Sequence, residues 1–302
     1  MKNKWIAVII VMAAVIIIVS CRTHFDHIKD GYSATASPQA LERGKVLLYT
    51  SCGGCHYNHT INKFIGMRIL DVPGIAGKVY SANLTRSTSH GIPPHYTDAA
   101  LKYLLKTGVA YDGRFIPYML RPNMSDEDIN AIIVYLRSDD PAVAAADTTV
   151  GITHYNIFGK FYMNSHAKPL PYTPGIKTPS ENEPVALGRY LVDNLACFHC
   201  HSKSLTSLNY LYPEQSKGYL AGGAKLKGEQ GKEVIASNIT PDKQTGIGNF
   251  TKEQFRKAVK DGEAPDGKLE PPMPKFQKLD NKEVDAIYAY LQTVPAKYNK
   301  IQ

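Results

Sequence analysis

The stretches CGGCH at residues 52–56 and CFHCH at residues 197–201 decide the interpretation of this 302-residue chain. Both follow the pattern C-x-x-C-H, which is the attachment signature of c-type haem. In that chemistry two thiols form thioether bonds to the haem vinyl groups, and the adjacent histidine takes one axial position on the iron. The sequence therefore predicts two covalently bound haem c groups. The predicted attachment residues are Cys52, Cys55, Cys197 and Cys200, and the predicted axial histidines are His56 and His201.

Other uses of paired cysteines are open to the same four thiols. In an exported protein they can form disulfides, and a CxxC pair can be a redox dithiol or half of a zinc site. Neither of the last two needs the histidine that follows each pair here. A shared zinc site would also join pairs about 140 residues apart, beyond the usual ligand spacing. Haem attachment is favoured, with zinc and disulfides as the alternatives.

The fifth cysteine, Cys21, ends a segment typical of an export signal. A basic start, MKNK, precedes fifteen apolar residues at 5–19, and the run IVSC at 18–21 resembles a bacterial lipobox. We expect residues 1–20 to be a lipoprotein signal peptide and Cys21 to be lipidated. The alternatives are simple secretion and an uncleaved anchor, although a spanning helix needs about 20 apolar residues. We expect a lipid-anchored chain on the periplasmic side of the cell membrane or outer membrane.

The charge of the chain is only mildly basic. It carries 35 Lys and Arg against 27 Asp and Glu, a formal net charge of +8. An exported chain with mixed charges is a poor candidate for nucleic-acid binding, so we expect none. The excess can steer an acidic redox partner weakly, and a plain solvated surface is the simpler interpretation.

The two motifs head two similar halves of the sequence. Asn-Leu-Thr at 83–85 and Asn-Ile-Thr at 238–240 each begin eight residues before a Gly-Ile pair. Each half also has a Thr eleven residues before a Gly, at positions 97 and 108 and again at 251 and 262. Matching spacings at several points indicate a duplicated domain.

Each half is predicted to open and close with a helix. The first domain is expected over residues 38–138 and the second over residues 181–302, with few strands in either. Capping residues and apolar periodicity place the helix boundaries. Opening helices are expected from Pro38 and over about Glu183 to Asn194, middle helices from Thr97 and Thr251, and closing helices from Ser125 and Asp280.

Two further segments lack this pattern. Residues 139–180 are rich in proline and have little periodicity, which predicts an irregular strap with a short helix near residues 152–162. Residues 21–37 are expected to be a flexible tether.

Methionines are the candidates for the second axial position on each iron. A Met–His pair gives a low-spin, high-potential electron carrier, because the soft thioether favours ferrous iron. Met273 lies in Pro-Pro-Met-Pro, and Met119 follows Pro-Tyr at the matching place in the first half. Met124 adjoins a helix cap and is expected in the core. As a ligand of the first haem it ranks behind Met119. His95 is the strongest spare ligand among the histidines.

At this point the pattern resembles the small class I cytochrome c fold. In that fold the first and last helices cross closely at a glycine, and Gly44 and Gly188 are the candidates, against Tyr135 and Tyr290. The resemblance implies an all-α fold with two tandem class I cytochrome c domains joined by the Pro-rich strap.

Residues 220–223 and 236–248 also resemble the multihaem cytochrome c family. That family includes the cytochrome subunits of membrane-bound alcohol and gluconate dehydrogenases, which usually carry three haems, whereas this chain has two motifs. The resemblance implies His56 with Met119, and His201 with Met273, as axial pairs.

These observations predict a membrane-tethered di-haem electron carrier rather than an enzyme. The expected partners are a dehydrogenase or quinol oxidoreductase as donor and a terminal oxidase or another cytochrome as acceptor. One alternative is a di-haem redox enzyme, a peroxidase or a sulfur-compound oxidoreductase, which needs one open iron. The other is a non-catalytic subunit held within a larger complex.

Overall fold

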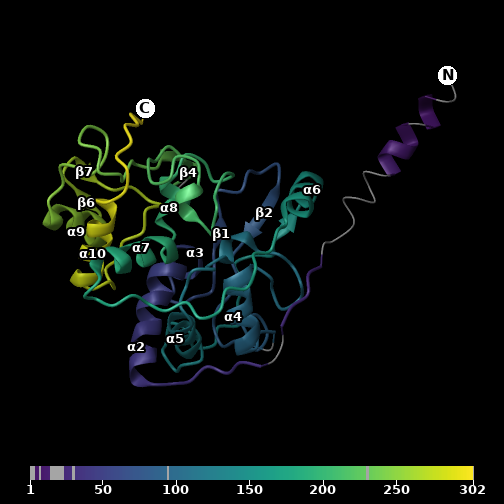
Figure 1. Cartoon of the computed structure of the whole chain (residues 1–302). Helices are drawn as coiled ribbons and strands as arrows, with labels where there is room; N and C mark the ends of the chain where they lie inside the picture. Colours follow the sequence, from purple (N-terminus) through teal and green to yellow (C-terminus); the bar gives the residue numbers. More distant parts are fainter. Residues whose placement is uncertain are drawn as a thin grey trace.

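The computed structural model describes residues 4–6, 8–13, 24–28, 31–93, 95–228 and 231–301. The described chain is mostly helical with small antiparallel sheets (Figure 1). Cys21 and the IVSC run lie outside the described residues. Across the described ranges, no helix combines the length and the apolar character needed to cross a membrane.

The first half is built on two crossing helices, α2 (Pro38–Leu47) and α5 (Asp126–Leu136). α2 begins at Pro38 as predicted, with Ser37 as its cap, and Ser125 caps α5 at the predicted start. A Cβ atom at Gly44 would lie 1.9 Å from the carbonyl oxygen of Ala131. Only glycine therefore permits this approach of the two backbones, and the predicted crossing is confirmed.

The second half repeats this arrangement with α7 (Pro184–Asn194) and α10 (Asn281–Leu291). A Cβ atom at Gly188 would lie 1.9 Å from the carbonyl oxygen of Ala286, and 2.8 Å from the Cβ of Tyr290. Asp280 and Glu283 form a reciprocal capping box at the start of α10, which satisfies two of the free N–H groups there. The second predicted crossing is confirmed as well.

The middle helices also match the predicted spacing. The first half has α4 (Asp98–Thr107) and the second has α9 (Lys252–Asp261). Thr97 and Thr251 cap them, and both end at a glycine in the left-handed conformation, with φ of 80° at Gly108 and 75° at Gly262. Side chains disfavour that conformation, so the glycines end the helices where the sequence predicts.

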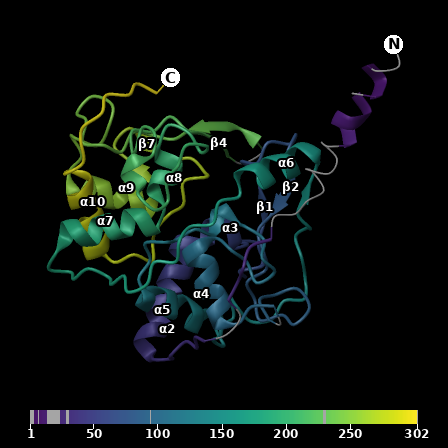
Figure 2. The same cartoon turned by 45° about the vertical axis from the view of Figure 1, so that its right-hand side comes forward.

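Each half contributes a cluster of buried apolar side chains. The first-half core gathers residues from Leu47 to Val143, and the second-half core gathers residues from Leu187 to Val294. Figures 1 and 2 show α2, α4 and α5 grouped on one side of the described chain, and α7, α9 and α10 on the other. Each helix group thus surrounds its own core.

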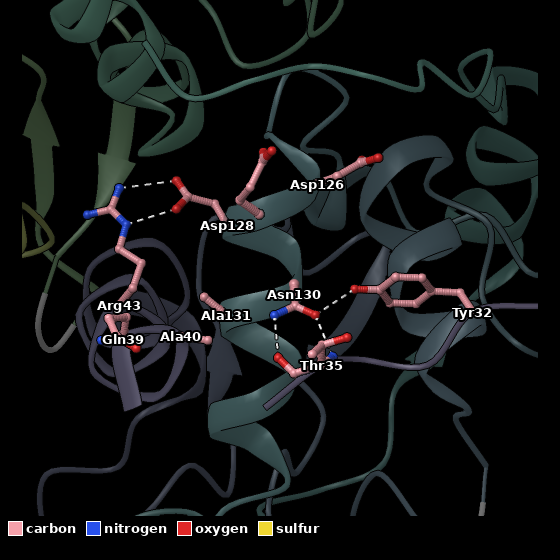
Figure 3. Close-up of a pocket in the computed structure, with 10 residues that line it drawn as sticks. Tyr32, Thr35, Gln39, Ala40, Arg43, Asp126, Asp128, Asn130 and Ala131 are labelled. Atoms are coloured by element: carbon pink, nitrogen blue, oxygen red, sulfur yellow. Dashed lines mark hydrogen bonds and ion pairs between the residues drawn. The ribbon is translucent and has the colours of Figure 1, made fainter. Parts of the chain in front are cut away.

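Polar side chains join the two halves near the crossing of α2 and α5. Arg43 pairs with Asp128 through Nε, 2.8 Å from Oδ1, and also pairs with Glu283 of α10. Tyr190 of α7 donates its hydroxyl to Asp128 at 2.7 Å and accepts the backbone N–H of Ser125 at 3.0 Å. Figure 3 shows Arg43 and Asp128 together beside the shallow pocket on this side of α5.

The strap differs from its prediction. The expected helix near 152–162 is instead α6 (Ile157–His166), because β3 (His154–Tyr155) pairs with β2 (Gly77–Tyr80) before the helix begins. β2 in turn pairs with β1 (Arg68–Ile69), so the strap supplies the third strand of a sheet. Short strands have too few residues for a readable alternation, which is why this sheet escaped prediction.

The second half also contains the 3-10 turn η3 (Pro213–Gln215). The second half has two further ribbons, β4 (Lys225–Lys227) with β5 (Glu233–Ile235) and β6 (Glu263–Ala264) with β7 (Gly267–Lys268). The strap then runs back along the first half, where Leu170 donates to Thr107 and Asp126 donates to Ile176 through backbone atoms.

The expectation of a flexible tether over residues 21–37 is wrong for its last part. Tyr32 donates its hydroxyl to the Asn130 side chain at 2.9 Å, and Asn130 also bonds both backbone groups of Thr35 (Figure 3). The backbone N–H of Ala34 donates to Asp98. These contacts are not predictable from the sequence, because single polar partners on distant helices leave no periodic pattern.

Candidate haem-binding sites

The first motif follows α2 without a break in the helical path. The chain passes from α2 through a π-helical turn, η1 (Leu48–Cys52), into the short helix α3 (Gly53–His56). His56 is buried, and its Nδ1 lies 2.8 Å from the carbonyl oxygen of Ala82. A carbonyl oxygen only accepts, so Nδ1 carries the proton and Nε2 keeps its lone pair. Burial also lowers the pKa of His56, which favours the neutral imidazole that a metal requires.

The second motif reaches the same arrangement by a different path. After α7 the chain turns through Ala196, with φ of 57° and ψ of 39°, and continues into α8 (Cys197–His201). The Nδ1 of His201 lies 2.8 Å from the carbonyl oxygen of Ser237. Both motif histidines thus present Nε2 and are oriented through Nδ1, which is how proteins orient histidine ligands.

The carbonyls that hold the histidines precede the repeated Asn-x-Thr elements. Asn83 donates its amide to the carbonyls of Ala146 and Thr148, each at 2.9 Å, and accepts the N–H of Thr85. These bonds fix the backbone that follows Ala82. The sequence shows the repeat, but it does not predict this role.

Asn238 makes the corresponding contacts in the second half. Its amide donates to the carbonyl of Lys297 at 2.7 Å, and its Oδ1 accepts the N–H of Thr240 at 2.9 Å. Matching spacing between the repeats was the signal that could have pointed to a shared function of the two asparagines.

The four motif cysteines are free thiols rather than disulfides. Burial raises the pKa of Cys52 to about 11, and that of Cys197 to about 12. Redox-active dithiols depend on a thiol whose pKa is lowered, so the surroundings do not favour that alternative. Among the described residues no group of three or more His, Cys, Asp or Glu could hold a metal ion. Paired free thiols beside an oriented histidine fit thioether attachment of haem.

Each candidate methionine packs against the same core cluster as one cysteine of the motif in its half. Met119 ends the 3-10 turn η2 (Pro117–Met119) and packs against the first-half core, as Cys52 does. Met273 packs against the second-half core, as Cys197 does. Met124 is fully buried in the first-half core, as expected. Ligation by Met119 and Met273 stays a prediction.

The spare histidines have other contacts in the structure. His95, the strongest alternative ligand by sequence, stacks on Tyr111 with 5.0 Å between ring centroids. His199, inside the second motif, bonds the hydroxyl of Tyr210 through Nδ1 at 2.6 Å.

The segment that carries Met119 contacts residues in or beside both motifs. The rings of Tyr118 and His199 lie 5.9 Å apart. Arg121 donates to the carbonyl of Ser51, just before the first motif, at 3.4 Å. Asn123 donates to the carbonyl of Tyr210 at 3.3 Å. Residues 118–123 therefore lie between the two candidate sites, which sequence reasoning did not foresee.

A buried lysine, Lys106, forms hydrogen bonds to backbone carbonyls in and just after the same segment. Lys106, at the end of α4, is fully buried and donates to the carbonyl of Met124 at 2.5 Å and that of Pro122 at 3.4 Å. Burial lowers the pKa of Lys106, while Asp126 opposes the shift. The nearby carboxylate and the two carbonyl acceptors compensate for the hydration that the Lys106 ammonium group loses on burial.

Comparisons with known proteins show which proteins this chain is similar to. The chain is 29% identical over 277 residues to the fructose dehydrogenase cytochrome subunit of Gluconobacter japonicus, covering 87% of this chain and 54% of that protein. It is 28% identical over 293 residues to the gluconate 2-dehydrogenase cytochrome c subunit of Pantoea cypripedii, covering 88% and 63%. The chain is similar to c-type cytochrome subunits of dehydrogenases.

A third relative extends the same similarity. The cytochrome c subunit of alcohol dehydrogenase (quinone) from Gluconobacter oxydans (strain 621H) is 25% identical over 241 residues, covering 76% of this chain and 48% of that protein. The chain therefore spans about half to three fifths of the length of these curated relatives. No family model matches the chain.

Proposed function

We propose that this chain is a di-haem c-type cytochrome that carries single electrons away from a dehydrogenase. The observation that carries the proposal is the repeated pairing of a CxxCH motif with a backbone carbonyl that orients its histidine. Two relatives whose names include a sugar or sugar-acid dehydrogenase support a dehydrogenase as donor.

The residues that would hold the haems divide equally between the halves. Residues 38–138 and 181–302 each form one class I cytochrome c domain in this proposal. The first haem takes Cys52, Cys55, His56 and Met119, and the second takes Cys197, Cys200, His201 and Met273. When bound, haem supplies reversible one-electron chemistry between ferric and ferrous iron.

The protein itself orients the two motif histidines, buries the haem sites and closes the irons to other ligands in this proposal. The Ala82 and Ser237 carbonyls hold the imidazoles of His56 and His201 in the tautomer that binds iron. Thioether sulfur from Met119 and Met273 would close the opposite faces and stabilise the ferrous state. No side chain is required as acid, base or nucleophile.

The proposed location is the periplasmic side of a membrane, with a lipid on Cys21. The export-type sequence ahead of Cys21 supports this placement. The acceptor would be a terminal oxidase or another cytochrome. Because electron transfer needs only close approach, the chain can act as a free carrier or as a subunit.

Paired variants test the assignment of one haem to each half. We expect two haems per chain by pyridine haemochrome assay, and one in Cys52→Ala/Cys55→Ala or in Cys197→Ala/Cys200→Ala. In the wild type, rapid mixing with a reduced quinone-dependent sugar dehydrogenase should reduce both haems. A wild-type count of one, or no reduction by any such donor, would overturn the proposal.

A further inference from the structure

The helix in the strap turns its apolar side chains toward solvent. On α6, Phe158 is 62% exposed, Ile157 and Phe161 are each 51% exposed, and Tyr162 is 46% exposed. These residues recur at helical spacing, so they form one face, which we call the α6 face. Exposed apolar surface gathered on one helix marks a contact with another apolar phase or molecule.

The orientation of α6 is held by its opposite side. A Cβ atom at Gly159 would lie 1.9 Å from the carbonyl oxygen of Ala76, so the helix backbone is pressed against the turn before β2. Asn156 caps the helix by accepting the N–H of Gly159 at 3.1 Å, and donates its own N–H to Ala76. The α6 face therefore points outward because the glycine side is fixed inward.

The charges around α6 suit an anionic surface. From Thr148 to Ser180 the sequence contains no Asp or Glu and three lysines, at positions 160, 168 and 177. In the sheet beneath the helix, the exposed Lys78 is paired in register with His154. Apolar side chains flanked by lysines are the pattern of helices that lie in a membrane interface.

The N-terminal segment reaches the protein close to the same place. The backbone N–H of Phe25 donates to the carbonyl of Gly113 at 2.9 Å. The guanidinium of the next residue, Arg114, is near enough to oppose the raised pKa that burial gives Tyr155, in the strand before α6. Figures 1 and 2 both show residues 24–28 on the side of the molecule where α6 lies.

Chain length then limits how far a lipid on Cys21 can be. Four residue steps separate Cys21 from Phe25, and a chain spans at most about 3.6 Å per residue, or about 14 Å here. A bilayer that holds Cys21 is therefore within reach of the side of the protein on which α6 lies.

We propose that the α6 face lies in the headgroup region of an anionic bilayer and forms a second membrane contact beside the lipid anchor. The proposal rests on the lipidation of Cys21 stated above. Contact at both points would hold the protein in one orientation on the membrane, whereas a lipid alone would leave it free to turn.

A spin label on α6 tests this contact in the lipidated, haem-loaded full chain. Ser165 is exposed and lies one turn beyond Phe161 and Tyr162, so Ser165→Cys carries the label, and Lys252→Cys at the start of α9 carries the control label. On vesicles of phosphatidylethanolamine and phosphatidylglycerol, access of an aqueous nickel complex to the position-165 label should fall several-fold. On phosphatidylcholine vesicles the fall should be smaller, and the position-252 label should stay accessible on both.

A second variant separates the face from the anchor. Phe158→Ser/Phe161→Ser should restore nickel access while the protein still sediments with vesicles. The matched control is Tyr298→Ser, which removes an aromatic ring that is 64% exposed in the second half and should change neither result.

Two outcomes would overturn the proposal. If the protein sediments with vesicles but the position-165 label stays accessible, the anchor stands and the α6 face is free for another partner, such as a dehydrogenase subunit. If the protein sediments with neither vesicle, both the face and the anchor fail. The haem count would still test electron transfer independently.

Discussion

The two halves present the same five-residue string on different backbones. Cys52 lies eight positions after Gly44, and Cys197 lies nine positions after Gly188. The shorter path continues helically through a π-turn, whereas the longer one places Ala196 in the left-handed region. Both end with the histidine bonded to a carbonyl at 2.8 Å. The comparison teaches that the helix crossing and the histidine contact are held constant, while the turn between them adapts.

The halves also differ in the burial of a lysine near the end of the middle helix. Lys106 of α4 and Lys260 of α9 both lie two residues before the terminating glycine. Lys106 is fully buried, whereas Lys260 is partly exposed and donates to the Asn281 side chain at 3.1 Å. The first half thus uses an internal lysine to hold the segment that lies between the two motifs.

The helix crossings should give the largest effect. In Gly44→Ala and Gly188→Ala, the new Cβ would meet a carbonyl oxygen at 1.9 Å, so the helices must separate. We expect a loss of about 3 kcal/mol or more in the free energy of unfolding, with haem lost mainly from the altered half. Thermal unfolding and haem content measure this. Gly74→Ala is the control, because a Cβ there meets nothing within 4 Å; equal stability of all three variants would refute a tight crossing.

Substitution of these two lysines should give the second-largest effect, with a larger loss of stability in the first half than in the second. Lys106→Met leaves the carbonyls of Pro122 and Met124 without their donor, and should cost about 2–3 kcal/mol. Lys260→Met should cost less than about 0.5 kcal/mol, as for an ordinary surface change. Chemical denaturation of the haem-loaded protein compares them, and similar losses in both variants would contradict the assigned role of Lys106.

A buried carboxyl group, Asp193, should make the stability of the second half depend on pH. Burial raises the pKa of Asp193 to about 7, although Arg189 opposes the shift; the corresponding residue in the first half is Tyr49. The folded protein then binds a proton that the unfolded chain has lost above its ordinary pKa near 3.9. Stability should therefore fall as pH rises, by about 1.4 kcal/mol between pH 6 and pH 8 for this group.

Asp193→Asn is the variant that isolates this contribution. It should flatten the dependence of stability on pH in that interval and raise stability at pH 8. Denaturation curves at several pH values measure it. If the variant keeps the full slope, another group is responsible.

The smallest expected effect concerns the adapted turn. Ala196 has φ of 57°, and an L-residue pays about 1–2 kcal/mol there. Ala196→Gly should stabilise the second half by about 0.5 kcal/mol, since the greater freedom of glycine in the unfolded chain offsets part of the gain. Thermal unfolding followed at the haem absorption reports it, and a lower midpoint would show that the Ala196 side chain makes contacts that matter more.

The helices and their crossings followed from the sequence because local rules determine them. Ser and Asp are common caps when they directly precede an apolar pattern of helical period. Ser125 and Asp280 cap α5 and α10 in this way. Gly44 and Gly188 were identified through the resemblance to a known fold, and the structure shows why no side chain fits there.

Contacts between distant segments could not be found in this way. The bond between Tyr190 and Asp128 links residues 62 positions apart and leaves no periodic trace in the sequence. The same holds for β3, which is two residues long and pairs with a strand more than 70 positions earlier. The histidine-to-carbonyl bonds were within reach, because the Asn-x-Thr repeat marked their position.

The ligands of the two irons decide between an electron carrier and an enzyme. We would record the optical spectrum of the purified haem-loaded protein, first ferric, then ferrous, and finally with carbon monoxide. We expect two low-spin haems with the weak far-red band of methionine-bound ferric iron and no reaction with carbon monoxide, because Met119 and Met273 would close both sites. A high-spin component that takes up carbon monoxide would contradict it, since one iron would then be open to a substrate.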